Sequence, residues 1–555
     1  MNSPAQSSIT SSTLNQTPIL TGYNLFVTDA ALVAAVQRGD AAWAHKDIAE
    51  FGRLLGTEEA QRWGVEANEN PPVLHTHDRN GDRRDEVLFH PSWHELMRTS
   101  IGHRLHSLPW LEKRKGAQLA RATLMMLAVQ NEAGHTCPVS MTFSGLAALQ
   151  AEPALAKQWG PQIVSSNYDP AFAPPDRKNG VLLGMGMTEK QGGSDVRANV
   201  TRAERIGASR EYLITGHKWF CSAPMCDAFL VLAQSDKGLS CFLLPRWAPD
   251  GGKNAFFIQR LKDKMGNRSN ASSEVEFQKA WAHIVGEEGR GVSTIIEMVN
   301  HTRLDCAIAA AGLMRQALVQ ALHHCRHRSA FGKLLIDHPL MRNVLADMAL
   351  ESEAATLLVT RLAEAFDRKA DNTEESGFAR LATAFSKFWL CKRVPIVVGE
   401  ALECLGGNGY VEESGLPRLY REAPLYGIWE GSGNVICLDV LRALSREPES
   451  IEALKAEFAS VRGSSKPLDA FLDETESQLL RVCKQQANGV EIEASARQLT
   501  ERLALATQAV LMVRHAKPEN AEMFVVSRIC GGHGQTFGTL SAGNFQGVLD
   551  RAFPA

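Results

Sequence analysis

Apolar side chains recur every three or four residues through most of the chain, with one interruption. The spacing predicts helices from Asp29 to about Trp159, where AQLARATLMMLAVQNEAG is typical. From 181 to about 285 the apolar runs are short and bounded by Gly, Asp and Asn, which predicts strands. Helical spacing returns at Gly291 and persists to about Leu444, and a last helical segment follows the polar stretch SREPES.

This order of helical, β, helical and helical regions predicts a mainly α protein with a central β domain. A chain of 555 residues exceeds one simple core, and its length favours three or four domains. We expect an N-terminal helical domain over 1–180, a β domain over 181–285, a helical domain over 286–445 and a C-terminal helical domain over 446–555. The polar start, MNSPAQSSITSSTLNQTP, lacks the regions of a secretory signal and is expected to be a disordered lead-in.

The composition of the chain excludes several classes of function. Apolar residues make up 44% and charged residues 22%, as in an ordinary globular protein. The net charge of −3 gives no global bias toward nucleic acid or anionic membranes. No stretch approaches about 18 uninterrupted apolar residues, so no membrane span is expected. The 11 cysteines include no CxxC pair and are expected to be reduced thiols of a cytoplasmic protein.

Two histidine pairs have the spacing of metal ligands but lack the rest of a metal site. His90 and His94, and His323 and His327, show neither the helical HExxH form nor an evident third ligand. We therefore expect no metal and assign these side chains to the surface or to packing. The acidic stretch DRNGDRRDE (78–86) lacks the ligand spacing of a calcium loop and is predicted to be a charged turn.

Two segments of the β region are candidates for ligand binding. GMGMTEKQGGSDV (184–196) ends a predicted strand in a glycine-rich turn, whose small residues let backbone N–H groups approach a ligand. A plain turn is an equally good interpretation, and the stretch is neither a Walker loop nor a Rossmann fingerprint. GHKWFCSAP (216–224) places Trp219 and Phe220 beside the Ser222 hydroxyl, although aromatic residues in a strand more often belong to a core.

Glu430 is the residue whose setting points most directly to chemistry. It lies between Trp429 and the small residues Gly431, Ser432 and Gly433, just before a predicted helix. Burial beside apolar surface would raise the pKa of the carboxyl and make it a better base near neutral pH. A glutamate in the first turn of a helix, favoured by the helix dipole, is the other interpretation, and the local sequence leaves both open.

Several segments, taken together, resemble the acyl-CoA dehydrogenase family of flavoproteins. The resemblance spans about 70 to 445 and is specific, because the segments occur in the family's order. They are MTEKQGGSD (187–195), GHKWFCSA (216–223), KMGNRSNASSEVEF (264–277), GEEGRGV (286–292), Arg328 with Phe331-Gly332, LADM (345–348), GGNGY (406–410) and IWEGS (428–432).

The resemblance implies an acyl-CoA dehydrogenase-like fold, with a central β-barrel domain and with FAD held non-covalently between the β and helical domains. It puts Met187, Thr188 and Ser194 along the flavin and substrate. It also puts Phe220 near the flavin ring and the Ser222 hydroxyl at N5. Further cofactor contacts are expected at neighbouring positions of the same segments: Cys221, Trp429, Ser432 and Asn434.

The resemblance also implies that two subunits share each cofactor site. Arg328 and the turn Gly406–Gly409, with Gly406 and Gly407 as contacts, would reach the FAD of a neighbouring subunit in a homotetramer. The family's FQ pair is His338-Pro339 here, so the grip on the cofactor's phosphates is expected to differ.

The family's glutamate at the position of Glu430 removes the α-proton of an acyl thioester, while a hydride leaves the β carbon for the flavin. Such a base needs a dry slot with apolar walls and small neighbours. Some members place the base on a helix matching MVNHTRLD (298–305), where this chain has Thr302, which cannot serve. Glu430 is therefore the predicted catalytic base, and Arg303 matches an arginine that helps hold the substrate site.

The sequences of several segments are most similar to the AidB branch of the family, which belongs to the adaptive response to alkylation. MTEKQGGSDV, PRLYREAP and IWEGSGN are typical of that branch, as is the added segment beyond 445. The resemblance implies an FAD protein of the DNA damage response that has weak acyl-CoA dehydrogenase activity, binds duplex DNA and protects it from alkylation. Arg442 and Arg528 are the expected phosphate contacts.

Charge gives the DNA hypothesis no independent support. The segment 446–555 holds 12 Lys or Arg and 14 Asp or Glu, whereas affinity for DNA comes mostly from basic groups. Two hypotheses of different class therefore stand. One is an FAD-dependent oxidoreductase that acts on an acyl thioester such as acyl-CoA, as a metabolic dehydrogenase would. The other is a flavin-stabilised DNA-binding protein whose catalytic residues are largely inherited.

Overall fold

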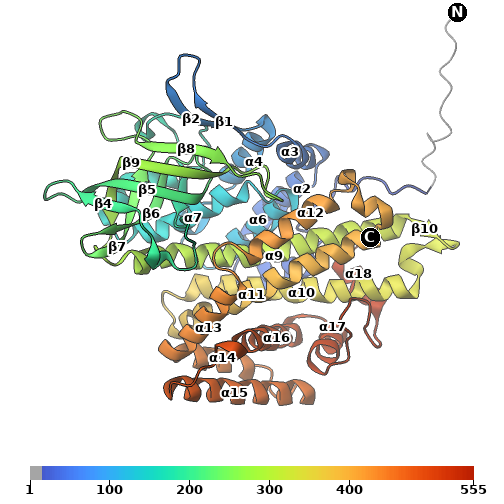
Figure 1. Cartoon of the computed structure of the whole chain (residues 1–555). Helices are drawn as coiled ribbons and strands as arrows, with labels where there is room; N and C mark the ends of the chain where they lie inside the picture. Colours follow the sequence, from blue (N-terminus) through green and yellow to red (C-terminus); the bar gives the residue numbers. More distant parts are fainter. Residues whose placement is uncertain (1–14, 555) are drawn as a thin grey trace, which may run out of the picture.

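Three long helices run through the middle of the protein, which a computed structural model describes over residues 15–554. α9 (Gly291–His327), α10 (Pro339–Arg368) and α11 (Thr373–Cys404) pack on one another, and the β domain lies at one end of them (Figure 1). The predicted fold class, mainly α with a central β barrel, is confirmed. The expected disordered lead-in falls almost entirely outside the described residues.

The N-terminal region forms helices where the apolar spacing predicts them. α6 and α7 are buried along nearly their whole length, so they are the inner helices of this region and the others surround them. The bounds are α1 (Ala30–Arg38), α2 (His45–Leu55), α3 (Glu58–Glu69), α4 (Pro91–Gly102), α5 (Leu108–Leu111), α6 (Ala117–Asn131), α7 (Thr136–Leu149) and α8 (Pro153–Ile163).

One hairpin in this region is not predicted by the sequence pattern. β1 (Val73–His77) and β2 (Arg83–Leu88) pair antiparallel and project from the molecule (Figure 1). The predicted charged turn begins at the tip of the hairpin, where the Asp78 carboxylate accepts hydrogen bonds from the backbone N–H groups of Asn80 and Asp82 at 2.8 and 3.0 Å. The strands are mostly polar and only Asp85 and Val87 in them are buried, so they carry little of the apolar alternation that predicts a strand.

Five strands of the β region close into a barrel. The strands pair in the order β6-β4-β5-β9-β7, and pairing of β7 with β6 closes the ring. β3 lies parallel to β6 outside the ring, and β8 pairs with β9. The bounds are β3 (Leu183–Gly186), β4 (Arg202–Arg205), β5 (Glu211–Ser222), β6 (Ala228–Ser235), β7 (Gly238–Pro245), β8 (Phe256–Leu261) and β9 (Ser272–Val285).

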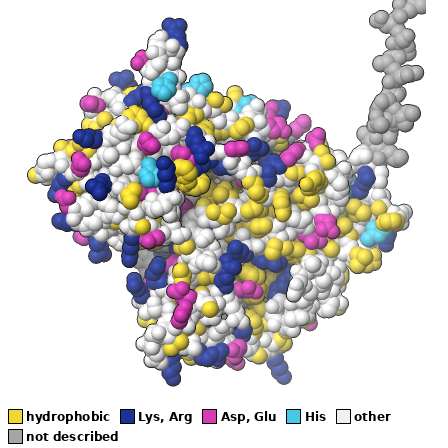
Figure 2. Space-filling view, in the orientation of Figure 1, with side chains coloured by type: hydrophobic (Ala, Val, Ile, Leu, Met, Phe, Trp, Pro, Cys, Tyr) yellow, Lys and Arg dark blue, Asp and Glu magenta, His cyan; other side chains and the backbone are white. Residues whose placement is uncertain are grey.

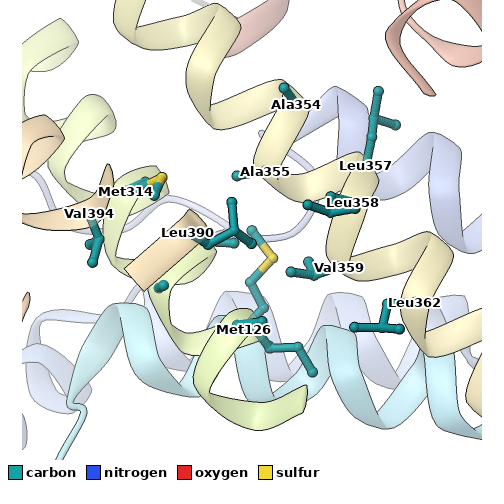
Figure 3. Packing of buried hydrophobic residues seen from close by; sticks show 14 of the residues in the cluster. Met126, Met314, Ala354, Ala355, Leu357, Leu358, Val359, Leu362, Leu390 and Val394 are labelled. Atoms are coloured by element: carbon teal, nitrogen blue, oxygen red, sulfur yellow. The ribbon is translucent and has the colours of Figure 1, made fainter. Parts of the chain in front are cut away.

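The central helices pack against the N-terminal helices through one apolar cluster. Figure 3 shows Met126 of α6 and Met314 of α9 in the same cluster as Leu358 of α10 and Leu390 of α11. Gly312 of α9 approaches α6 so closely that a Cβ there would lie 2.8 Å from a backbone oxygen of α6. This packing fixes α9 and α11, which carry the side chains around Glu430.

The helices beyond Leu444 share a hydrophobic core with α10 and α11. Trp389 Nε1 of α11 donates to Gln508 Oε1 at 2.9 Å. No described helix is both long and apolar enough to span a membrane. The remaining bounds are α12 (Leu416–Glu422), η8 (Ala423–Gly427), α13 (Gly433–Arg446), α14 (Glu449–Ala459), α15 (Lys466–Ala487), α16 (Ala496–His515), α17 (Pro518–Phe524) and α18 (Phe545–Ala552).

Candidate functional site

Glu430 lies in the short loop between η8 and α13, and its backbone is left-handed. Its φ is +58°, which is uncommon for a residue with a side chain, and Gly431 follows at +105°. Lys387 of α11 holds this loop by donating to the carbonyl oxygens of Trp429 and Gly431 at 2.9 and 2.5 Å. Arg303 of α9 donates to the carbonyl oxygen of Glu430 at 3.0 Å. Two cations from two helices thus fix an unusual backbone.

The Glu430 carboxylate is bonded at one of its two oxygens. Thr302 of α9 donates its hydroxyl to Oε2 at 2.6 Å. Burial raises the pKa of Glu430, while the Thr302 hydrogen bond and the charges of Arg303 and Lys387 oppose the rise. The upward direction agrees with the prediction from its apolar setting. Thr302, which cannot itself act as the base, instead orients the glutamate.

Arg303 is held in turn by a buried carboxylate. Asp439 of α13 accepts from Arg303 Nη1 at 2.8 Å and from Arg380 of α11 at 3.0 Å. These two cations lower the pKa of Asp439 despite its burial. Arg303 is therefore a positioning group for the loop, and its predicted contact with the substrate stays a prediction.

The glycine-rich turn after β3 is held against the barrel by contacts with β5. Glu189 is fully buried and pairs with Lys218 of β5 at 2.7 Å. The Thr188 carbonyl accepts from Trp219 N–H at 2.8 Å, and a Cβ on Gly193 would lie 2.4 Å from Thr188 Oγ1. The turn is therefore tightly folded. It leaves Ser194 exposed, whereas Met187 lies partly buried against the barrel core.

The predicted cofactor residues on strand β5 alternate between an exposed face and a buried face. Phe220 is 50% exposed and Ser222 is partly exposed, and the Ser222 hydroxyl lies 3.4 Å from Ser272 Oγ. Cys221 between them is fully buried, and burial raises the pKa of its thiol to about 12. The Cys221 side chain belongs to the barrel core, so only its backbone faces the site.

The predicted cofactor residues around Glu430 differ in their exposure and in the contacts of their side chains. Trp429 packs edge-to-face on Tyr426, with ring centroids 5.5 Å apart. Ser432 is exposed at the start of α13, and its side chain makes no capping bond. Asn434 is exposed and accepts from Arg497 of α16 at 2.9 Å.

Arg328 and the turn at Gly406 and Gly407 lie far from Glu430 in the same chain. Arg328 follows Arg303 by 25 residues along α9, which at about 1.5 Å per residue separates them by roughly 38 Å. Gly406 follows α11, roughly 28 Å beyond Lys387 by the same rise. These positions therefore lie too far away to contact Glu430 in their own chain, and the expectation that they reach the cofactor of a neighbouring subunit stays a prediction.

A cleft of about 1080 Å³ opens between the barrel, the start of α9 and α13. Ser194 lies on one wall, and Asp439, which holds Arg303, lies on another. Figure 2 shows basic side chains gathered where the β domain meets the helices beneath it. The guanidinium groups that line the cleft are those of Arg197, Arg290, Arg380, Arg442 and Arg446.

The two arginines predicted to contact DNA have different environments. Arg442 is 58% exposed in the cleft wall and makes one contact of 3.4 Å with Asp439. Arg528 is 7% exposed and pairs with Asp347 and Glu351 at 2.5 and 3.3 Å. Its charge is buried and neutralised, so the prediction that Arg528 contacts DNA is corrected.

Lys387, Arg380 and Asp439 belong to the site but were not predicted from the sequence. Lys387 interrupts the otherwise apolar run AFSKFWL on a helix, and a lone lysine in such a run is a signal of a buried functional charge. Arg380 and Asp439 carry no such signal. Among the described residues, no cluster of His, Cys, Asp or Glu could hold a metal.

Three domain families match successive parts of the chain. Residues 15–170 match the adaptive response protein AidB N-terminal domain. Residues 184–280 match the acyl-CoA dehydrogenase middle domain, and residues 289–445 match the acyl-CoA dehydrogenase C-terminal domain.

Individual relatives extend over most of the chain. The putative acyl-CoA dehydrogenase AidB of Escherichia coli (strain K12) is 46% identical over 515 residues, which covers 92% of this chain and 93% of that protein. Acyl-CoA dehydrogenase family member 11 of Caenorhabditis elegans is 29% identical, with coverage of 87% and 83%. The crystal structure of Caenorhabditis elegans ACDH-11 with C11-CoA has a TM-score of 0.84 at 25% identity and covers 99% of this chain and 93% of that one.

Acyl-CoA dehydrogenases are FAD-dependent flavoproteins, and the residues in this site fit that cofactor. The half-exposed Phe220 ring offers a face for a flavin, and the weakly bonded Ser222 hydroxyl is available as a donor. The tight turn at Gly193 lets the backbone approach a ligand. From the matched domains and the extent of the similarity to AidB, the chain is a flavoprotein of the acyl-CoA dehydrogenase family and belongs to its AidB branch.

Proposed function

We propose that the protein oxidises an acyl thioester between its α and β carbons, with Glu430 as the base. The observation that carries this proposal is the asymmetric carboxylate. Thr302 holds Oε2 at 2.6 Å, whereas Oε1 has no hydrogen-bond partner within residues 15–554. One oxygen is oriented and the other is free to take a proton, as general-base catalysis requires.

Other residues of the chain support the proposed reaction by holding the Glu430 loop and by contacting the flavin. When bound, FAD supplies the acceptor for the hydride that leaves the β carbon. Burial raises the pKa of Glu430, which strengthens it as a base. Lys387 and Arg303 hold the loop, so the carboxylate keeps its position without a reorganisation step. Phe220 and Ser222 are proposed as flavin contacts on the opposite side.

Acyl-CoA is the proposed form of the substrate. Coenzyme A carries phosphate groups, and guanidinium groups offer bidentate donors that suit phosphate. Five arginines line the cleft, of which Arg380 is already paired with Asp439 and Glu447. The cleft also leads from solvent past Ser194 toward the Arg303–Asp439 pair beside Glu430.

An anaerobic titration tests this function. Purified protein loaded with FAD is mixed with a panel of acyl-CoA thioesters, and the flavin absorbance near its visible maximum is followed. Bleaching by at least one thioester supports the proposal. A flavin that no thioester reduces, in protein that still binds coenzyme A, would refute it.

Binding of duplex DNA, with protection from alkylation, is a second candidate function. Two observations favour it: the relationship to AidB and the exposure of Arg442 in a cleft with four other arginines. The same groups would serve the phosphates of either ligand. Free coenzyme A should therefore compete with a fluorescent duplex for the protein, and failure to bind duplex at low salt would leave only the flavoenzyme function.

A homotetramer is the proposed assembly. Figure 2 shows a broad hydrophobic area on the face around α12. Exposed apolar residues on the elements of the proposed contact include Tyr410 at 84% and Ile428 at 66%, with Phe331 at 97%. Patches of this kind mark interfaces in soluble proteins. Assembly would also bring Arg328 and the Gly406 turn to a neighbour's cofactor.

A further inference from the structure

A group of buried polar side chains lies next to the Glu430 loop and has no role in the steps above. Its centre is Glu422 of α12, which is 3% exposed and accepts from the backbone N–H of Asn267 at 2.7 Å. Asn270 Nδ2 donates to Asn267 Oδ1 at 3.2 Å, and both asparagines are 1% exposed. The loop between β8 and β9 therefore faces α12 through polar atoms.

Lys264 connects this group to the proposed flavin side of the site. Its ammonium donates to the backbone oxygen of Asn270 at 2.5 Å and to Ser272 Oγ at 3.0 Å. Ser272 Oγ lies 3.4 Å from the Ser222 hydroxyl. Polar groups thus run without a break from Glu422 to the residue proposed to meet the flavin.

Tyr426 and Trp429 connect the group to Glu430. Tyr426 is 2% exposed, and the negative charge of Glu422 contributes to raising the pKa of its phenol, after the larger effect of burial. Its ring packs on that of Trp429, the residue before Glu430. We call the six residues Lys264, Asn267, Asn270, Glu422, Tyr426 and Trp429 the polar ring.

The Cys137 thiol of α7 links the two ends of the polar ring. Burial raises the pKa of this thiol to about 12, and both Lys264 and Glu430 contribute electrostatically to it, as do hydrogen bonds to the side chains of Asn270 and Ser222. The charges of Lys264 and Glu430 both act on this thiol. The packing of Tyr426 on Trp429, next to Glu430, and the contacts from Lys264 through Ser272 to Ser222 connect the polar ring to both the base and the proposed flavin contact. We therefore place the acyl chain of a substrate beside it.

Five atoms of the polar ring are buried without a hydrogen-bond partner among the described residues. They are Asn267 Nδ2, Asn270 Oδ1, Glu422 Oε2, Tyr426 OH and Trp429 Nε1. Each buried, unpaired polar atom costs about 1–3 kcal/mol, and most folded proteins avoid such atoms. A polar ligand bound beside these atoms would supply the missing hydrogen-bond partners. An alkyl chain would leave all five unpaired.

We propose that the polar ring recognises an uncharged polar group, a hydroxyl or an amide, on the acyl chain of the substrate. This inference rests on the proposed acyl-thioester function and specifies its substrate class. An anionic group is disfavoured because the ionised Glu132 lies beside Glu422, and burial together with the charge of Glu132 already raises the pKa of Glu422 to about 7. A cationic group would compete with Lys264 and Arg418. A hydroxyl or an amide matches both the donors and the acceptors without adding charge.

Matched thioesters test the proposal on the FAD-loaded protein. The ω-hydroxybutyryl, ω-hydroxyvaleryl and ω-hydroxyhexanoyl thioesters of coenzyme A are each compared with the alkyl thioester of equal chain size. Dissociation constants are measured by calorimetry under conditions that prevent turnover. At least one hydroxyacyl thioester should bind about tenfold more tightly than its alkyl partner, as expected for about one net hydrogen bond.

Tyr426→Phe removes one of the unpaired atoms, the phenol oxygen of Tyr426. Tyr420→Phe, on the exposed side of α12, is the matched control. Tyr426→Phe should remove most of the preference for the hydroxyl while leaving alkyl affinity and the melting temperature unchanged or higher. A lower melting temperature with an unchanged preference would mean that the ring holds only buried water, which overturns the inference. Alkyl thioesters that bind as tightly as hydroxyacyl ones at every length would also overturn it. Absence of binding by any thioester would instead refute the proposed function itself.

Discussion

At the scale of single residues, the left-handed backbone at Glu430 shows how the chain positions a carboxylate. A glutamate with φ near +58° is unfavourable by about 1–3 kcal/mol unless its surroundings impose it. The carbonyl groups on both sides of Glu430 accept from Lys387, and its own carbonyl accepts from Arg303. These contacts stabilise the conformation and direct the side chain toward Thr302.

The Thr302 hydrogen bond leads to a prediction about pH. Glu430 acts as a base only when ionised, so kcat/KM should rise with pH through its pKa and then level off. Thr302 lowers that pKa by bonding the charged form, and Thr302→Val should therefore move the rise upward by about one pH unit. The pH profile of flavin reduction checks this. Thr356→Val, a buried threonine on α10, is the control, and a profile that moves equally in both variants would contradict the assignment.

At the scale of elements, the buried pair Glu189–Lys218 fixes the turn that carries Met187 and Ser194. Lys218→Met leaves the Glu189 carboxylate buried without its partner, which should destabilise the protein by about 3–5 kcal/mol. Because the turn loses its anchor, affinity for FAD should fall as well. Denaturant unfolding and FAD titration measure the two effects.

Two further variants decide whether the buried pair is the cause. The double variant Glu189→Gln/Lys218→Met removes both charges and should recover most of the lost stability. Lys237→Met, at an exposed lysine of the same domain, should change little. A single variant as stable as the wild type would show that the pair does not hold the turn.

The elements differ in how far the sequence could predict them. α9 begins at Gly291, where the sequence predicts that helical spacing returns, because its buried face gives a long periodic signal. The β1–β2 hairpin gave no such signal, because its strands are mostly polar and only Asp85 and Val87 in them are buried. Glu430 was predicted from its neighbours and from the family resemblance. Lys387 was not predicted, although its place in an apolar run is a signal of a buried charge. Of the polar ring only Trp429 was predicted, because tertiary packing alone brings α12 and the β8–β9 loop to the Glu430 loop.

At the scale of the whole molecule, the arginine cleft lies where the barrel, α9 and α13 meet. Arg442→Glu should weaken binding to unrelated duplex sequences equally and lower the salt slope by about 0.9 for each DNA phosphate that the variant no longer neutralises. The flavin spectrum should not change. Arg79→Glu on the exposed hairpin tip is the control, and equal weakening by both variants would contradict a role for the cleft.

The proposed homotetramer leads to a second prediction at this scale. Phe331→Asp puts a charge on a side chain that is 97% exposed in the single chain and should break the tetramer into smaller species. FAD affinity should fall with it, because Arg328 of a neighbour would leave the site. Light scattering and FAD titration report both effects, with Val73→Asp on the hairpin as control. A tetramer that survives Phe331→Asp would place the interface elsewhere.

The identity of the base is most directly tested by single-turnover reduction of bound flavin. Wild-type, Glu430→Gln and the exposed control Glu413→Gln are loaded with FAD and mixed without oxygen with an acyl-CoA that reduces the wild type. Glu430→Gln keeps size but cannot accept the α-proton, so its rate should fall at least about 10²-fold while FAD and acyl-CoA still bind. Glu413→Gln should match the wild type. Reduction of Glu430→Gln at the wild-type rate would contradict Glu430 as the base.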